Sequence, residues 1–189
     1  LLEELELKDF ASESGLWSVV NLSEAKKANR IDAEYFQPKY EQLLKLTKKA
    51  SVAKQLVEIS SIKRGSLINP RFYDDTDGTP YIRGGDFSSG ELGKDKVVYI
   101  NSNFEPKNET RIKTGDLVFA LIGSVGTSAL VGKEFNNSFI SNNVGKIIIK
   151  NKEELLPEYL VIVLQSMVGK FQFEKEASQT AQPKISDAQ

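Results

Sequence analysis

Two short stretches place basic side chains beside glycines. Ile62–Gly65 reads IKRG and Tyr81–Phe87 reads YIRGGDF. Glycine lets a backbone approach a phosphate closely, and the planar fork of arginine can pair with O6 and N7 of a guanine. The pattern indicates a candidate contact with nucleic acid. The alternative is that these basic side chains are simply solvated, as most basic turn residues are.

Amide side chains follow at turns later in the chain. Ser141–Asn143 reads SNN between two β-type runs, and adjacent asparagines can read N6 and N7 of adenine. The alternative is an ordinary turn. Gln179–Ser186 (QTAQPKIS) offers amides and a lysine in a polar tract, or serves only as a linker to the next element.

Histidine and cysteine are both absent from the 189 residues. The chain therefore lacks the commonest general base near neutral pH, the commonest zinc ligand and every thiolate or disulfide. A Ser-His-Asp or Cys-His arrangement cannot be built within it. The lack of cysteine also fits a reducing compartment.

Gly123–Lys133 reads GSVGTSALVGK and comes close to a phosphate-binding loop. That motif needs a glycine, four residues and then Gly-Lys-Ser/Thr. Here Thr127 stands at the first glycine, and Glu134 replaces the hydroxyl that would hold magnesium. We therefore expect no nucleotide site, and interpret Gly123 and Gly126 as a turn between two strands.

Two further patterns approach catalytic sites without completing them. Asn69–Phe72 (NPRF) is one residue away from the Asn-Pro-Pro-aromatic signature of adenine methyltransferases, with Arg71 in the third place and no glycine-rich cofactor strand before it. Asp86, Glu91 and Lys94 could surround a metal in a nuclease, but they stand in a Gly/Ser loop with no strand to hold them. We expect neither chemistry, and no cofactor or metal.

The elements that must position these groups belong to a chain of ordinary globular composition. It is 40% apolar and 27% charged, with a formal net charge of −1. Its length suits one domain, with or without an appendage. The balanced charge argues against a basic protein that coats nucleic acid, but a module could still bind DNA with one face.

Nothing in the sequence predicts a membrane span or export, because no run of 18 apolar residues and no signal-peptide pattern is present. Since the sequence starts at Leu1, we interpret it as a fragment of a longer cytoplasmic protein. Leu1–Lys8 (LLEELELK) suits the end of an amphipathic helix.

Helical and β-type patterns alternate with turns along the chain. Asp32–Lys49 predicts a helix with Pro38 in its first turn. Trp17–Leu22 predicts a short strand, and Pro157–Phe173 a second, largely buried helix. Further strands are expected near Ser61–Lys63, Tyr81–Arg83, Val97–Ile100, Leu117–Ile122, Ala129–Val131, Phe139–Ile140 and Val144–Lys150, with loops at Asp74–Thr79, Ser88–Gly93 and Glu134–Ser138.

A series of short segments stands out in order along the chain: Arg30–Tyr40 (RIDAEYFQPKY), Ile59–Gly65 (ISSIKRG), Pro80–Phe87 (PYIRGGDF), Lys113–Val125 (KTGDLVFALIGSV), Ser141–Ile149 (SNNVGKIII), Pro157–Leu164 (PEYLVIVL) and Gln182–Ser186 (QPKIS). Together they resemble the target-recognition domains in specificity subunits of type I restriction–modification enzymes. The resemblance covers roughly residues 30–186. It departs from the family at Thr180-Ala181, where many relatives carry a glycine.

The resemblance implies an α+β fold in which helices pack on a twisted, curved, mixed sheet of short strands. Residues 1–15 would be the tail of a preceding conserved helix, and 16–189 the recognition domain. Within that domain we expect a helical opening at 30–50, a mainly β core at 51–152, a helix at 157–173 and a polar exit segment at 174–189. It would be the second, C-terminal recognition domain of its subunit.

The resemblance also implies sequence-specific recognition of double-stranded DNA. The domain would read one half of a bipartite target and carry no catalysis of its own. Modification (methyltransferase) subunits and restriction subunits would be its partners. The alternatives are the recognition end of a single-chain restriction–methylation enzyme, and a partner-docking scaffold that lacks DNA contacts.

Chemistry and approximate motif position together suggest the DNA contacts. Phosphate anchors are expected at Lys63, Arg64 and Lys146, base-edge contacts at Arg71, Arg83, Asn142, Asn143 and Gln182, and a further contact at Lys184. We also expect one concave face to gather Lys63, Arg64, Arg83 and Lys146.

Overall fold

The computed structural model describes residues 18–49, 53–88, 91–93, 97–104, 106, 108–177, 180 and 182–185. The expected helix tail at 1–15 lies outside the described residues. The chain divides into two units, Leu1–Lys54 and Gln55–Gln189. All the described strands belong to the second unit. Within the described ranges, no helix combines the length and apolar character that a membrane span needs.

The first unit contains the short helix α1 (Leu22–Ala28). The backbone N–H of Asn21 donates to the Glu24 carboxylate at 3.1 Å at its start, and Asn29 ends it in the left-handed region with φ 52°. The strand expected at 17–22 is therefore wrong over its described residues. Residues 18–21 lie in neither a helix nor a strand, and Leu22 begins α1, which local capping at both ends favours.

Helix α2 (Pro38–Lys49) begins later than the expected start at Asp32. Before it, the Asp32 carboxylate accepts the Tyr35 N–H at 3.1 Å and pairs with Arg30 at 2.6 Å. The hydrogen bond from Arg30 holds the pKa of Asp32 below its usual value. Because proline lacks an N–H and disfavours helical geometry in the preceding residue, Pro38 sets the start of α2.

The second unit opens with helix α3 (Leu56–Ile59) and contains two four-stranded sheets. The first sheet has the order β1-β10-β7-β8, and each neighbouring pair is antiparallel. Its strands are β1 (Ser60–Arg64), β10 (Val144–Ile149), β7 (Leu117–Ala120) and β8 (Ser128–Leu130).

The second sheet has the order β2-β6-β3-β9 and is mixed, because β3 and β9 run parallel. Its strands are β2 (Tyr73–Asp74), β6 (Val98–Ile100), β3 (Thr79–Ile82) and β9 (Phe139–Ile140). A separate hairpin pairs β4 (Phe87–Ser88) with β5 (Glu91–Leu92). The hairpin lies largely where the sequence suggested a loop at Ser88–Gly93, and β2 was not among the expected strands.

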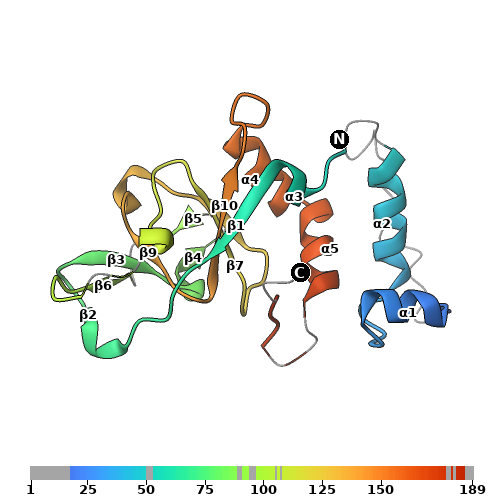
Figure 1. Cartoon of the computed structure of the whole chain (residues 1–189), viewed down its shortest axis with the longest axis horizontal. Coiled ribbons are helices and arrows are strands. Elements are labelled where there is room, and N and C mark those ends of the chain that lie inside the picture. Colours follow the sequence, from blue (N-terminus) through green and yellow to red (C-terminus); the bar gives the residue numbers. More distant parts are fainter. Residues whose placement is uncertain are drawn as a thin grey trace. The chain divides into compact units, whose positions relative to one another are not determined.

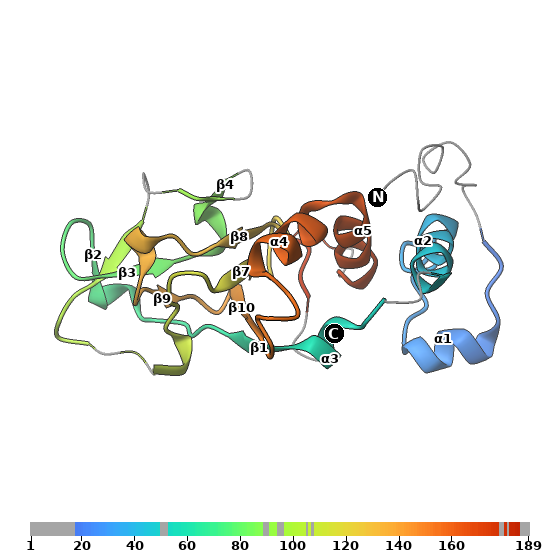
Figure 2. The same ribbon diagram turned by 90° about the horizontal axis from the view of Figure 1, so that it is seen from above.

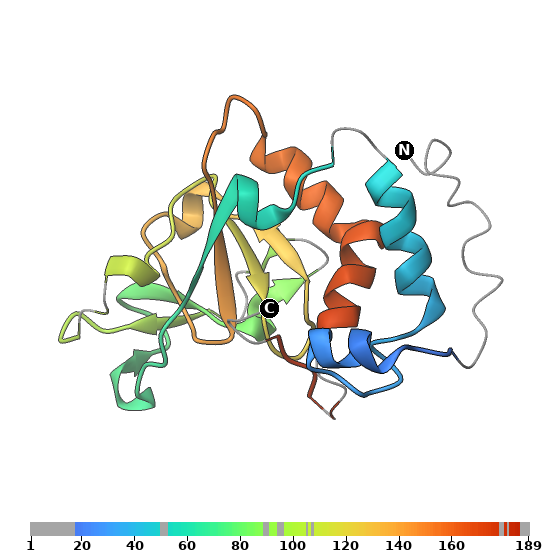
Figure 3. The ribbon, with the colours of Figure 1, turned by 45° about the vertical axis from the view of Figure 1, so that its right-hand side comes forward.

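Helices α4 (Pro157–Gln165) and α5 (Met167–Glu176) cover one face of the first sheet (Figures 1 and 3). The strands of the second sheet lie on the side of the first sheet away from these helices (Figures 1 and 2). The core between sheet and helices includes Leu117, Phe119, Leu121, Ile147, Ile149, Leu160, Val161 and Leu164. The core on the other face includes Ile82, Ile112, Val118, Ala129, Ile140 and Val144.

The helix expected at 157–173 is two helices, because the chain is extended at Ser166 with ψ 168°. The Ser166 hydroxyl donates to the Val163 carbonyl at 2.6 Å, and its own carbonyl accepts the Lys170 N–H at 2.9 Å. This serine therefore satisfies the end of α4 and the start of α5 at once. A Cβ on Gly169 would lie 2.4 Å from the Leu164 carbonyl oxygen, so glycine is needed for the tight bend.

The expected α+β class is confirmed, and every strand expected from the sequence within the β core is present with small shifts of its ends. Over the described residues, single-turn 3-10 helices lie between strands at η1 (Pro70–Phe72), η2 (Gly84–Asp86), η3 (Asn108–Thr110) and η4 (Lys133–Phe135).

Candidate nucleic-acid interface

Segments that are far apart in sequence meet at one end of the first sheet. Directly after β1, the Gly65 N–H donates to the Val144 carbonyl at the start of β10, at 3.0 Å. In the turn before β10, the Ser141 N–H donates to the Ile82 carbonyl at the end of β3, at 2.8 Å. The ends of β1 and β3 and the start of β10 therefore lie together.

The end of β7 and the segment 182–185 join the same place. The Leu121 N–H donates to the Asn143 carbonyl at 2.9 Å, and the Leu121 carbonyl accepts the Ile185 N–H at 3.0 Å. The Gly123 N–H donates to the Pro183 carbonyl at 2.9 Å. Six candidate residues lie on these segments, and we call them the strand-end cluster: Arg64, Arg83, Asn142, Asn143, Gln182 and Lys184.

Arg64 holds the turn of the strand-end cluster, because its Nε donates to the Asn142 carbonyl at 2.5 Å. Arg64 pairs with Gly145 on β10, and a Cβ on Gly145 would lie 2.6 Å from the Phe119 ring. Phe119 belongs to the core beneath α4 and α5. Arg64 thus leaves β1 on the face that those helices cover, and its guanidinium reaches back to the turn.

The glycine beside Arg64 serves the fold. A Cβ on Gly65 would lie 2.1 Å from the Ile140 carbonyl oxygen and 2.2 Å from that of Ser141. No side chain fits at that separation, so only glycine lets the end of β1 approach β9. The close approach that IKRG suggested is therefore made to the protein's own backbone.

Arg83 is held by the buried carboxylate of Asp86, whose side chain is 2% exposed. Oδ2 of Asp86 accepts the Arg83 backbone N–H at 2.7 Å. The Arg83 guanidinium lies against the same group, with Nη2 3.3 Å from Oδ1 and Nε 3.5 Å from Oδ2. In the sequence, Asp86 suggests only a group beside a metal. The signal for this pair is the position of Asp86 three residues after Arg83, across a Gly-Gly turn.

Lys63 and Lys146 are partners across β1 and β10. Because successive strand residues point to opposite faces, this pair lies on the face opposite to Arg64, away from α4 and α5. The expectation that one concave face gathers Lys63, Arg64, Arg83 and Lys146 is therefore wrong, since these cations are divided between two faces. Lys63 is exposed on its face.

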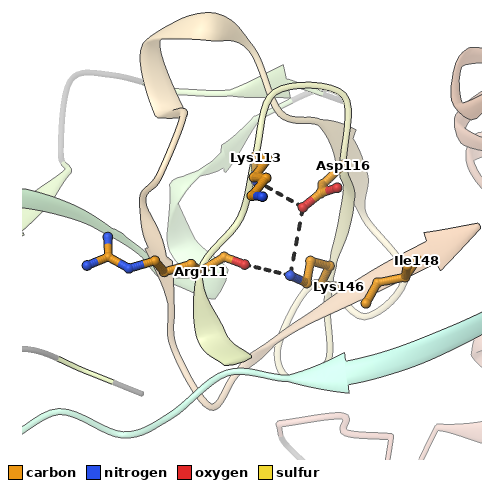
Figure 4. A pocket seen from close by; sticks show the side chains of 5 residues that line it. All are labelled: Arg111, Lys113, Asp116, Lys146 and Ile148. Carbon is orange, nitrogen blue, oxygen red and sulfur yellow. Dashed lines mark hydrogen bonds and ion pairs between the residues drawn. The ribbon is translucent and has the colours of Figure 1, made fainter. Parts of the chain in front are cut away.

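Lys146 turns inward, with a side chain that is 12% exposed. Its Nζ donates to the Arg111 carbonyl at 2.5 Å and lies 3.8 Å from Oδ2 of Asp116 (Figure 4). Together with Lys113 and Ile148, these residues line a shallow pocket of about 440 Å³. The contacts make Lys146 a brace between β10 and the loop before β7.

Arg71 lies on η1 beside β2, at the outer edge of the second sheet. Its guanidinium carbon is 4.6 Å from the centre of the Phe72 ring, and Phe72 stacks on Phe104 with ring centres 4.3 Å apart. The Asn69 side chain caps the turn by accepting the Arg71 N–H at 3.0 Å. We call Arg71, Phe72 and Phe104 the stacked platform.

Tyr81, two residues before Arg83, lies in the core cluster that packs against Phe72 and Phe104. Its hydroxyl donates to the Ser66 carbonyl at 2.7 Å. Burial raises the pKa of Tyr81 well above its ordinary value, so the hydroxyl remains a hydrogen-bond donor. This bond ties the segment after Gly65 to β3.

The sequence patterns that approach a metal site and a phosphate-binding loop can be followed in the described part of the chain. Among the described residues, no three acidic, histidine or cysteine side chains are grouped so that they could hold a metal. Glu91 is exposed on β5, and Lys94 lies outside the described residues. Gly123 and Gly126, with φ of 81° and 80°, form the turn between β7 and β8 that the sequence suggested.

Specificity subunits are among the solved structures that resemble this chain. One is the S subunit of a type I restriction–modification system from M. genitalium, at 16% identity over 71% of this chain and 31% of that chain, with a TM-score of 0.51. Another is the HsdS subunit from Thermoanaerobacter tengcongensis, at 14% identity over 79% of this chain and 37% of that chain, also with a TM-score of 0.51. Both likenesses show the fold, and the chain spans well under half the length of either protein.

Among curated proteins, no match to this sequence was found. The family model for the type I restriction modification DNA specificity domain matches residues 48–189. That match includes the whole strand-end cluster, the stacked platform and both sheets. Because it covers most of the sequence, the chain belongs to the family of type I restriction–modification DNA specificity domains.

Proposed function

We propose that this chain reads one half of a bipartite DNA target for a type I restriction–modification enzyme. Its family is a DNA specificity domain, so its work is sequence-specific DNA recognition and not catalysis. The observation that carries the proposal is the strand-end cluster, where separate segments bring two arginines and three side-chain amides to one end of a sheet. Modification and restriction subunits would supply the chemistry.

The chemistry of the cluster suggests a division of labour. Arg83 has the planar fork that pairs with guanine, and the amides of Asn142 and Asn143 suit adenine. Gln182 is a third amide, exposed on the segment that pairs with the end of β7. These side chains are proposed to face base edges.

Phosphate anchoring is proposed for the exposed lysines Lys63 and Lys184. Arg64 differs from them, because its bond to the Asn142 carbonyl makes it a support for the turn that carries the amides. Because the Lys146 ammonium donates to the Arg111 carbonyl, Lys146 is not proposed as a phosphate anchor. Within the cluster, Arg83 and the amides are thus proposed to read bases, whereas Lys184, together with Lys63 outside the cluster, would hold the backbone of the DNA.

The test uses the full specificity subunit assembled with its modification subunits, and competition between specific and random duplexes. Arg83→Ala should cost about 1–3 kcal/mol on the specific duplex only and relax one position of the motif. Lys63→Ala should weaken both duplexes about equally and lower the salt slope by roughly one unit. Lys152→Ala is the matched control, because Lys152 is exposed beyond the far end of β10.

Two results would count against the proposal. If Arg83→Ala weakens both duplexes equally, Arg83 is a phosphate contact and not a base reader. If neither Arg83→Ala nor Lys63→Ala changes binding, these side chains face a partner, and the scaffold alternative is favoured. Mapping of the methylated motif tests the bipartite part, because Arg83→Ala should alter only one half of it.

A further inference from the structure

Asp86 is a buried acid to which the proposed DNA contacts give no role. A buried carboxylate costs several kcal/mol unless a cation and hydrogen-bond donors compensate for its lost water. Here the compensation comes from one residue, since both the backbone N–H and the guanidinium of Arg83 approach the carboxylate, at 2.7 Å and 3.3 Å. The pair is therefore part of how Arg83 is presented.

The carboxylate occupies one edge of the guanidinium. Nε and Nη2 of Arg83 face Asp86, at 3.5 Å and 3.3 Å from its oxygens. The guanidinium is planar, so its other edge, formed by Nη1 and Nη2, points away from the carboxylate. That edge has the two parallel donors that match O6 and N7 of guanine.

Asp86 is itself fixed from a second direction. Its carbonyl accepts the Gly93 N–H at 2.8 Å, which ties the turn to the residue that directly follows β5 of the hairpin. On the other side of the turn, a Cβ on Gly84 would lie 3.8 Å from Cβ of Asn143, next to the amides of the strand-end cluster. The Arg83 side chain remains 37% exposed. A buried acid with a fixed backbone thus holds a partly exposed guanidinium beside the proposed base readers.

We propose that Asp86 is a positioning residue, which orients Arg83 for reading a guanine and does not touch the DNA itself. The inference rests on the proposed function. An arginine already held in one orientation loses less freedom on binding, so the benefit falls on the specific complex. Contacts to phosphates depend mainly on charge and gain little from that orientation.

Asp86→Asn distinguishes a purely electrostatic effect from a loss of positioning, because the two predict opposite changes in affinity for the specific duplex. The substitution keeps an oxygen that can accept the Arg83 N–H, and it removes one negative charge. Electrostatics alone predicts equal or tighter binding to every duplex. Loss of positioning predicts an affinity for the specific duplex about tenfold lower, while affinity for a random duplex is unchanged or slightly higher. The measurement is the specific-to-random affinity ratio of the assembled enzyme, with a thermal melt of each variant.

Asp74→Asn is the matched control. The Asp74 carboxylate also caps a turn, accepting the Thr76 and Asp77 N–H groups at 2.9 Å and 3.1 Å. The charge change is the same, but Asp74 lies on β2, beside the stacked platform. The ratio of specific to random affinity measured for Asp74→Asn should equal that of the unmodified protein.

The double variant tests whether Asp86 acts through Arg83. In an Arg83→Ala background, Asp86→Asn should change the affinity ratio no further. Asp86→Glu covers the case in which Asp86→Asn does not fold, because it keeps the buried charge but shifts the guanidinium by about one methylene, and it should also lower the ratio.

The outcomes separate this inference from the proposed function. If Arg83→Ala relaxes one base position but Asp86→Asn and Asp86→Glu leave the ratio unchanged, the positioning role is overturned and the proposed reading stands. A ratio that stays constant while both affinities fall together also overturns it. If Arg83→Ala itself leaves base preference unchanged, the assignment of Arg83 as a base reader fails first.

Discussion

Arg83 in the strand-end cluster and Arg71 in the stacked platform are held in place by different interactions. Two guanidinium nitrogens of Arg83, Nε and Nη2, face the two oxygens of the buried Asp86 carboxylate. This arrangement restricts both the position and the rotation of the guanidinium plane. Arg71 rests on the Phe72 ring at 4.6 Å, a contact worth about 0.5–1 kcal/mol at an exposed site. A ring face lets the cation slide. The first arrangement suits the reading of one base, and the second an adaptable contact.

The two regions also differ in how they are built. The platform uses a turn whose residues are neighbours in the chain, with Phe104 added from beyond β6. The cluster uses backbone hydrogen bonds among segments that are far apart in sequence, such as Leu121 with Asn143 and with Ile185. The cluster therefore depends on the folding of the whole second unit, and small errors in packing should disturb it first.

The largest expected effect breaks the cluster at Gly65. In Gly65→Ala, an ideal Cβ would lie 2.1 Å from the Ile140 carbonyl oxygen, which is far inside van der Waals contact. The end of β1 must therefore move away from β9. We expect a loss of about 3 kcal/mol in the free energy of unfolding, measured by urea denaturation. Gly85→Ala is the control, since a Cβ there meets no atom within 4 Å. Equal stability of the two variants would contradict the close packing described here.

Lys146 sharpens the comparison, because it is a cation that belongs to neither region. Lys146→Met removes the donor to the Arg111 carbonyl and the charge beside Asp116, and should lower stability by about 1–2 kcal/mol. Its inward direction predicts that the salt slope of DNA binding stays unchanged, in contrast to Lys63→Ala. A salt slope lowered by about one unit would show instead that Lys146 contacts a phosphate in the complex.

The smallest expected effect concerns Arg71. Arg71→Ala should weaken specific and random duplexes to the same extent, by less than about 1 kcal/mol, because an arginine that slides over a ring contributes charge more than selectivity. The same competition assay measures it. A loss confined to the specific duplex would make the stacked platform a second base-reading region and would remove the distinction from the strand-end cluster.

Much of the second unit could be predicted from local pattern. Runs such as Leu117–Ile122 and Val144–Lys150 are rich in β-branched and apolar residues, and both form strands of the first sheet. The break at Ser166 could not be predicted in this way, because the apolar pattern continues through it. The hairpin of β4 and β5 is missed for a related reason, since its two-residue strands are too short for a periodic signal.

The sequence by itself determined which side chains are present and which chemistry is excluded. Without histidine or cysteine, these 189 residues cannot build a Ser-His-Asp or Cys-His site, and ordered segments from Arg30 to Ser186 point to the family. It also showed that Arg83 and the pair Asn142 and Asn143 stand at turns, where a sheet can present them.

Only the tertiary structure decided which partner each charged group takes. Arg64 bonds to the Asn142 carbonyl, 78 residues away, and Lys146 to the Arg111 carbonyl, 35 residues away. Asp86 is close to Arg83 in sequence, but only the surrounding packing buries its carboxylate and so makes the ion pair with Arg83 necessary. Residue type and period are local properties that a sequence records. Burial and partnership arise when distant segments fold together, and these determine whether a cation faces DNA or braces the protein.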